Sequence, residues 1–216
     1  MLEREGELVR RIQRKDDARR IAYEFNECQR CHNAFPDPQR QMMRVGHPCP
    51  ICGEPSEIGC DWPHFEAAHC LEVGLRQDWN QDEQRQIGVI FLAVGAEALL
   101  RETLFQMIAY KSNDARLGRA VMKNCEGRQR GLELFKVLTE VSLGKFWKKK
   151  GLQNLYLQWG HLAEERNCVA HGDLWGSVGK FPVAPELFCK DLLSGFASVH
   201  NDFIVPLRIR PSVTSP

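Results

Sequence analysis

Four cysteines of the chain form two Cys-x2-Cys pairs, Cys28/Cys31 and Cys49/Cys52, and 17 residues separate the pairs. A two-residue gap lets a tight turn direct both sulfurs at one ion, and Zn²⁺ binds four thiolates in a tetrahedron. Proline and glycine around the second pair favour such a turn, because Gly53 can adopt a positive φ beside the metal. The sequence therefore predicts one structural Zn²⁺ per chain, held by Cys28, Cys31, Cys49 and Cys52.

A site closed by four thiolates has no open coordination position, so we expect a structural or recognition role and no catalytic metal. His32 and His47 flank the pairs and are the alternative ligands. Four later residues could suggest a second ion but lack a matching pair: Cys60, His64, His69 and Cys70. We interpret the two cysteines as buried free thiols and the two histidines as ordinary surface residues. Three further cysteines lie in helical patterns and are predicted to be core residues: Cys125, Cys168 and Cys189.

A second group of reactive residues lies near the end of a predicted helix. At 100° per residue, Arg166 falls between Trp159 and Leu162 on the apolar face, where a guanidinium is costly unless an anion or a partner chain meets it. In an unbroken helix, His171 would point about 140° away from Arg166. If Gly172 ends the helix, the imidazole can turn back, and the two side chains can share a cleft.

Helices must position these residues, because apolar side chains recur at helical spacing through most of the chain after residue 80. A long amphipathic helix of roughly eight turns is predicted over 80–110, with Asn80 and Glu83 as a capping pair. Further helices are predicted over 117–122, 132–144 and 152–171, and from Pro185 to Pro206. The predicted fold class is mainly α, a helical bundle preceded by a small zinc ribbon.

Changes in composition predict five segments along the chain. They are a charged helix at 1–24, the zinc ribbon at 25–59, a connector at 60–79 interrupted by Gly74, the bundle at 80–206 and a tail at 207–216. A hydrophobic content of 43% is enough for a buried core. We expect no membrane contact and a cytoplasmic location, because no apolar stretch is long enough to span a bilayer and no secretory signal is present.

The net charge of +1 conceals two blocks of opposite sign. Residues 51–100 carry two basic and nine acidic residues, a net of −7, and residues 101–150 carry twelve basic and five acidic residues, a net of +7. The basic block could bind a polyanion. The simpler interpretation is a solvated helix surface, or an interface between the two blocks.

The segment around Arg166 resembles the HEPN superfamily of helical ribonucleases and nucleotide-binding domains. The hallmark of that family is an arginine, a polar residue that is usually asparagine, a short spacer and a histidine often followed by glycine. Here these are Arg166, Asn167, His171 and Gly172, and the resemblance covers about residues 80–205. It departs from one branch of the family, the toxins paired with a nucleotidyltransferase antitoxin, because Asp173 stands where that branch has a tyrosine.

The resemblance implies a homodimer that cleaves RNA without a metal, leaves 2′,3′-cyclic phosphate and 5′-OH ends, and acts in defence or stress. It assigns catalysis to Arg166, Asn167 and His171. An imidazole can transfer the protons of the reaction, and a guanidinium can bind the developing charge on phosphorus. The expected partners are RNA, with tRNA among the candidates, a second copy of the chain, and an inhibitor or activator protein. Basic residues expected to bind RNA phosphates are Lys148, Lys149, Lys150, Arg116 and Arg119.

Other interpretations stay open for each of these residues. Glu97 and Arg101 could support the site, or form an ordinary i,i+4 ion pair. Arg166 and His171 could be a cation favoured by the helix dipole and a capping histidine. The alternative function is a non-catalytic adaptor whose ribbon and helical dimer bind nucleic acid or another protein.

Overall fold

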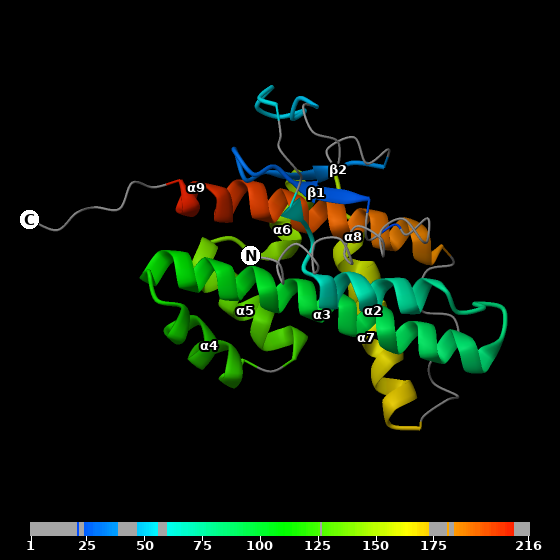
Figure 1. Cartoon of the computed structure of the whole chain (residues 1–216). Coiled ribbons are helices and arrows are strands. Elements are labelled where there is room, and N and C mark those ends of the chain that lie inside the picture. Colours follow the sequence, from blue (N-terminus) through cyan, green and yellow to red (C-terminus); the bar gives the residue numbers. More distant parts are fainter. Residues whose placement is uncertain are drawn as a thin grey trace, which may run out of the picture.

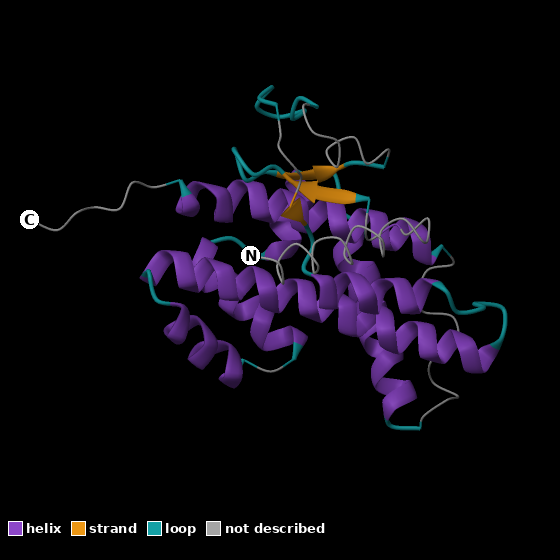
Figure 2. Ribbon diagram, viewed as in Figure 1, coloured by secondary structure: helices purple, strands orange, loops and turns teal. Residues whose placement is uncertain are grey.

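The computed structural model describes residues 21, 24–38, 47–55, 60–125, 127–172, 181 and 184–209. Helices form most of this part, and a small sheet lies along one side of them (Figures 1 and 2). The predicted mainly helical class is therefore confirmed. The helix predicted at 1–24, apart from residues 21 and 24, lies outside the described residues, as does the tail from 210 onward.

The helices follow one another along the chain as α2 Phe65–Leu75, α3 Asp82–Ser112, α4 Ala115–Asn124, α5 Arg128–Thr139, α6 Leu143–Lys149, α7 Leu155–Ala170, α8 Pro185–Val199, the π-helix η3 His200–Ile204 and α9 Val205–Arg208. The strands are β1 Phe25–Glu27, β2 Ala34–Pro36 and β3 Cys60–Asp61. They form an antiparallel sheet in the order β2-β1-β3. In the described part of the chain, no helix is long and apolar enough to cross a membrane.

The long helix α3 is the centre of the bundle and contacts α2, α4, α5, α7 and α8. Glycines bring α2 close to it. A Cβ atom at Gly95 would lie 2.8 Å from the Leu71 side chain, and one at Gly74 would lie 2.7 Å from Leu92. Gly74 lies in the last turn of α2, which ends one residue later at Leu75, so the predicted interruption coincides with the end of the helix. The missing side chain also lets α2 pack closely on α3.

Two predicted helix ends differ from the structure. The capping pair Asn80/Glu83 is wrong, because α3 begins after Gln81 and the Gln81 side chain makes no capping hydrogen bond. The helix predicted to end near residue 144 ends at Thr139, where Glu140 has a left-handed φ of 62°. The separate helix α6 follows. Periodicity alone did not reveal this break, because the apolar pattern continues across it.

The last helical stretch continues through Pro206 and does not end there. Helix α8 runs to Val199, η3 follows it, and α9 begins at Val205. Pro206 thus lies in the first turn of α9, directly after the π-helical turn η3. The additional turns after Val199 supply the residues that contact the sheet.

The sheet is attached to η3 through Asn201. The Oδ1 atom of Asn201 accepts a hydrogen bond from the Ala34 N–H at 2.7 Å, and its Nδ2 donates to the Ala34 carbonyl at 2.8 Å. Phe25 and Ala34 are buried in the same apolar core as the helices. The sheet, whose strands β1 and β2 flank the first cysteine pair, therefore rests on the bundle through both polar and apolar contacts.

A buried polar network lies beside this attachment. Glu27 is 8% exposed, and its carboxylate accepts a hydrogen bond from Arg208 at 2.6 Å. The Nε2 atom of His200 donates to the His32 carbonyl at 2.9 Å. Burial lowers the pKa of His200, while Glu27 raises it. Residues that follow the first cysteine pair thus share hydrogen bonds with the last helical segment.

Replacing Asn201 with alanine should weaken the attachment of the sheet. The Asn201→Ala variant leaves the Ala34 N–H and carbonyl without partners, so we expect a loss of about 1–3 kcal/mol in the free energy of unfolding, measured by denaturant titration. Asn154→Ala is the control, because Asn154 is exposed and its side chain does not cap α7. Equal stability of the two variants would contradict the role given to Asn201.

Candidate functional site

The four cysteines predicted as metal ligands come together. Their sulfurs lie within 4.8 Å of one another, with 4.0 Å between Cys28 and Cys52 and 3.8 Å between Cys31 and Cys49. Zinc–sulfur bonds of about 2.3 Å place two sulfurs of a tetrahedron about 3.8 Å apart. The spacing therefore fits a tetrahedral metal ion. Among the described residues, this is the one group of three or more candidate ligand side chains close enough to share an ion.

Each cysteine pair lies in its own backbone turn, and the two turns are of the same kind. The Cys28 carbonyl accepts a hydrogen bond from the His32 N–H at 2.8 Å, and the Cys49 carbonyl accepts one from the Gly53 N–H at 2.9 Å. His32 and Gly53 have left-handed φ angles of 58° and 75°. The positive φ predicted for Gly53 is confirmed. The His32 ring lies 3.3 Å from Glu27 and is not one of the clustered ligands.

The metal site is partly shielded by the protein. Cys28 and Cys49 are buried with Phe35 in a small core of their own, whereas Cys52 is exposed. Burial raises the pKa of Cys49 to about 12, so a metal ion must displace a proton to bind this thiol. Elsewhere, the predicted core cysteines Cys125 and Cys189 are buried and Cys168 is half-buried.

Arg166 meets an anion on the apolar side of α7. One of its terminal nitrogens lies 2.5 Å from Oε1 of Glu97 on α3, and the two side chains are 32% and 23% exposed. Glu97 therefore pairs across two helices, and no ion pair joins it to Arg101 in the described part of the chain. Arg101 is exposed, and its guanidinium lies 3.4 Å from the Met122 carbonyl.

Asn167 and His171 are both exposed at the C-terminal end of α7. The helix ends at Ala170, and Gly172 has a left-handed φ of 73°, so the predicted helix end is confirmed. Within the described residues, no hydrogen bond or ion pair joins Arg166 to Asn167 or His171. The structure thus gathers the three residues over about one and a half helical turns, with the guanidinium fixed and the other two side chains facing solvent.

The lysines predicted to bind RNA lie far from His171. Lys148 and Lys149 end α6, directly before α7, and the 16 residues of α7 span about 24 Å. Lys150 pairs with Asp202 at 2.8 Å. Arg116 and Arg119 are exposed on α4, which Figure 1 shows well apart from the C-terminal end of α7.

Two charged residues of this region were missed in the sequence. Glu165 is 4% exposed and accepts hydrogen bonds from Arg85 at 2.8 Å and from the Phe181 N–H at 3.0 Å. In the sequence, Glu165 follows Leu162 by three residues and so falls on the apolar face of the helix, which is the feature that could have indicated a buried carboxylate. Arg128 lies over the rings of Tyr156 and Trp159, and its sequence position gave no signal for this contact.

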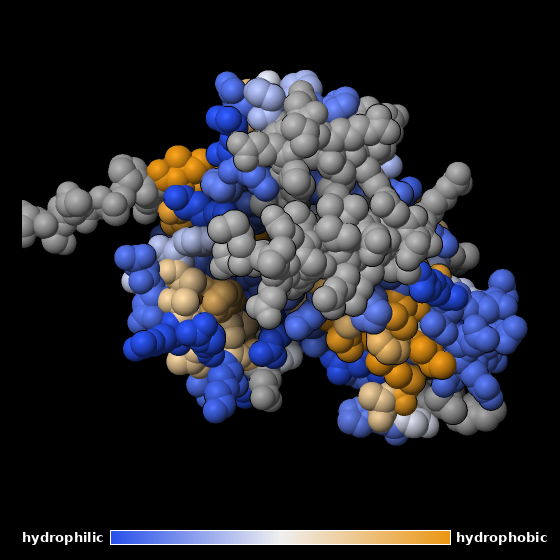
Figure 3. Space-filling model, viewed as in Figure 1, coloured by the Kyte–Doolittle hydropathy of each residue, from blue (hydrophilic) through white to orange (hydrophobic). Residues whose placement is uncertain are grey.

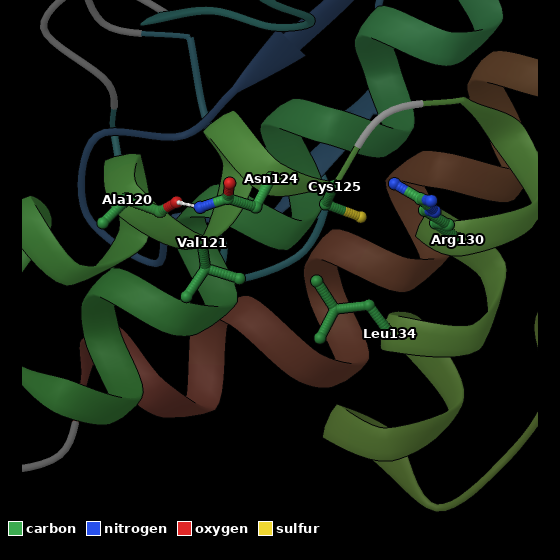
Figure 4. A pocket seen from close by; sticks show the side chains of 6 residues that line it. All are labelled: Ala120, Val121, Asn124, Cys125, Arg130 and Leu134. Carbon is green, nitrogen blue, oxygen red and sulfur yellow. Dashed lines mark hydrogen bonds between the residues drawn. The ribbon is translucent and has the colours of Figure 1, made fainter.

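Two apolar surfaces of the bundle lie near or between its first helices. Figure 3 shows hydrophobic surface gathered over α3, where Ile87 and Val94 are 42% and 45% exposed. A hollow of about 490 Å³ lies between α4 and α5 (Figure 4). Its lining residues are Ala120, Val121, Asn124, Cys125, Arg130 and Leu134. None of the predicted site residues lines this hollow.

Loss of one cysteine ligand should empty the metal site. We expect one zinc ion per chain in the parent protein and none in Cys52→Ser, measured by elemental analysis after dialysis. The variant should also unfold at a lower temperature, because the cysteine turns are attached to the bundle. Cys70→Ser is the control, since Cys70 is a free cysteine outside the cluster. Equal metal content in both variants would rule out this site.

The chain was compared with models of protein families, with curated proteins and with solved structures, and none of them matches it. The likeness to HEPN proteins therefore depends on the residues around Arg166 and on the helical character of the fold. What the chain does has to be argued from its own geometry.

Proposed function

We propose that the chain is a metal-independent endoribonuclease of the HEPN type that acts as a homodimer. The observation that carries the proposal is the pairing of Arg166 with Glu97, beside Asn167 and His171 at the exposed end of α7. This pairing orients a half-buried guanidinium and leaves part of its N–H fork for a phosphate. We further propose that the ion of the four-cysteine site is Zn²⁺ and that its role is structural.

The reaction follows from what these groups can bind and transfer. The 2′-OH of a ribose attacks the adjacent phosphorus and loses its proton, and the bond from phosphorus to the 5′-oxygen breaks as that oxygen takes up a proton. The products are a 2′,3′-cyclic phosphate and a 5′-OH. Imidazole can act as the base or the acid, and Arg166 stabilises the charge on the phosphoryl oxygens. Asn167 orients the phosphate or the histidine.

A dimer would supply both proton-transfer groups, one His171 from each chain. The exposed apolar residues Ile87 and Val94 lie seven positions apart, on one face of α3, and Glu97 is one turn further along. An apolar surface next to the charged residues is suited to a second copy of the chain, which would bring two Arg166/His171 sets together.

Cleavage should depend on His171 and Arg166. The parent protein, incubated with total RNA and with tRNA in buffer containing EDTA, should give fragments that end in 2′,3′-cyclic phosphate. His171→Ala and Arg166→Ala should reduce the rate at least a hundredfold, because each removes a group that acts in the transition state. The control is His161→Ala, an exposed histidine ten residues earlier on α7. Undiminished cutting by His171→Ala would refute the proposed site.

Introducing charged residues on the apolar face of α3 should dissociate the proposed dimer. In the double variant Ile87→Asp/Val94→Asp, each carboxylate would be buried without a partner at the interface, so we expect monomers by light scattering and loss of cleavage. Val137→Asp is the control, since Val137 is 75% exposed on α5. A double variant that remains dimeric would exclude this face as the interface.

A non-catalytic adaptor is the second candidate. The closed four-cysteine site favours it, because such sites hold a fold or a recognition surface and do not react. Glu97 also gives Arg166 a structural partner. The adaptor should bind RNA or protein with no fragments formed, and His171→Ala should leave that binding unchanged.

A further inference from the structure

Arg128, at the start of α5, is held by two aromatic rings of α7. Its guanidinium carbon lies 5.0 Å from the ring centre of Trp159 and 5.2 Å from that of Tyr156. Stacking on aromatic rings fixes the guanidinium plane and leaves the N–H groups at its rim for other partners. Arg128 is thus a preorganised cation between α5 and α7.

No carboxylate neutralises Arg128 directly. Within the described part of the chain it makes no ion pair, and its Nε atom is buried without a hydrogen-bond partner. Burial lowers the pKa of Arg128, whereas Tyr156, Glu97 and Glu164 raise it. A bound anion would offset the cost of burying this charge.

Arg128 belongs to a group of three arginines around Glu97. A narrow gap between α3, α4 and α5 is lined by Glu97, Arg101 and Arg128. Glu97 also pairs with Arg166. Counting Glu164, which acts on Arg128, the group has three positive and two negative charges, a net of +1. One guanidinium in the group is paired with a carboxylate, and among the described residues the other two make no ion pair, although Arg101 donates a hydrogen bond to the Met122 carbonyl.

An open hollow next to this gap shares two lining residues with it, Arg101 and Met122. This hollow, of about 450 Å³, lies between α3 and α4, and Arg119 and Lys123 stand at its side. Phe105 forms part of its apolar lining, and Glu66 and Glu102 line it as well. Glu102 accepts a hydrogen bond from Gln106 at 2.6 Å. Arg101 therefore connects the Arg128 group to a space large enough for a nucleotide unit.

We propose that Arg128 and Arg101 form a phosphate subsite for the RNA strand, next to the phosphate that Arg166 would bind. The inference rests on the proposed function and extends it, because it gives the strand a direction from α7 across Glu97 toward α4. Guanidinium forks bind phosphate oxygens in pairs, and the stacked Arg128 loses little freedom on binding. Arg119 and Lys123 would bind the backbone further along the strand.

The test measures binding separately from cleavage. The probe is a fluorescein-labelled 12-nucleotide RNA in which every 2′-OH is methylated, so that it cannot be cut by the proposed reaction. Its affinity for the full-length protein is followed by fluorescence anisotropy over a range of salt concentrations. Arg128→Gln and Arg101→Gln should each weaken binding roughly tenfold. Each should also make the slope of log K against log salt shallower by about 0.7, the effect of losing one phosphate contact on a single strand.

Matched controls separate a binding role from a structural one. Arg130→Gln changes an exposed arginine on the same helix, on the side of the other hollow (Figure 4), and should bind the probe as the parent does. Arg128→Gln removes a stacked residue, so its unfolding temperature is measured too. Arg101→Gln does not share that risk, because Arg101 is exposed and unstacked. A folded Arg101→Gln variant with parental affinity and salt slope would overturn the proposal.

The result is independent of whether the protein cuts RNA. If Arg128→Gln and Arg101→Gln both lose probe binding while cleavage does not need His171, the phosphate subsite is supported and the proposed nuclease site is refuted. Cleavage that needs His171, with parental binding by both variants, would do the reverse. Pyrophosphate serves as a competitor. If it displaced the probe only in proteins that keep Arg101 and Arg128, the subsite would be confirmed as one for phosphate.

Discussion

A guanidinium on the apolar side of α7 needs a carboxylate, and this requirement fixes how α3 and α7 meet. Arg166 pairs with Glu97, and the adjacent Glu165 pairs with Arg85, twelve positions earlier on α3. Two neighbouring residues of α7, one acidic and one basic, thus each form an ion pair with a different residue of α3. A shift of one helix along the other would bring like charges together or leave buried charges unpaired, which costs several kcal/mol. The two pairs therefore set the alignment of the helices that carry the candidate site.

The segment that carries the first cysteine pair is linked to the same bundle by hydrogen bonds. The first cysteine turn ends at His32, whose carbonyl accepts a hydrogen bond from His200, and Asn201 holds the next strand at Ala34. These partners lie in consecutive positions of η3, and π-helical turns are frequent where a helix has a specific task. An ion bound by the four cysteines would therefore be thermodynamically linked to the position of η3. Asp202 of the same segment also pairs with Lys150, the residue that follows α6.

The sequence predicted the features that depend on local spacing. Two cysteine pairs with turn-forming neighbours gave the four ligands, and the 3.6-residue period gave the long helix α3 to within a few residues. The apolar position of Arg166 also predicted that an anion or a partner chain had to meet it. Contacts between distant segments could not be read in this way. In the sequence, the nearest candidate partner of Glu97 was Arg101, four residues away on the same helix. In the structure Glu97 pairs with Arg166, because α7 packs on α3. The close packing of Gly74 against Leu92 was missed for the same reason, because Leu92 lies on another helix.

The partner of Arg166 also determines what the candidate site needs in order to bind a phosphodiester. A carboxylate that orients the guanidinium repels an incoming phosphate, so a lone Arg166–Glu97 pair would offer little net attraction. Arg128 and Arg101 change this balance, because they add two positive charges next to Glu97 and make no ion pair within the described residues. Glu97 can then act as a support for Arg166 while the group as a whole stays cationic. Under the proposed function, Arg128, which lies outside the sequence motif, would therefore contribute to binding the substrate together with the motif residues.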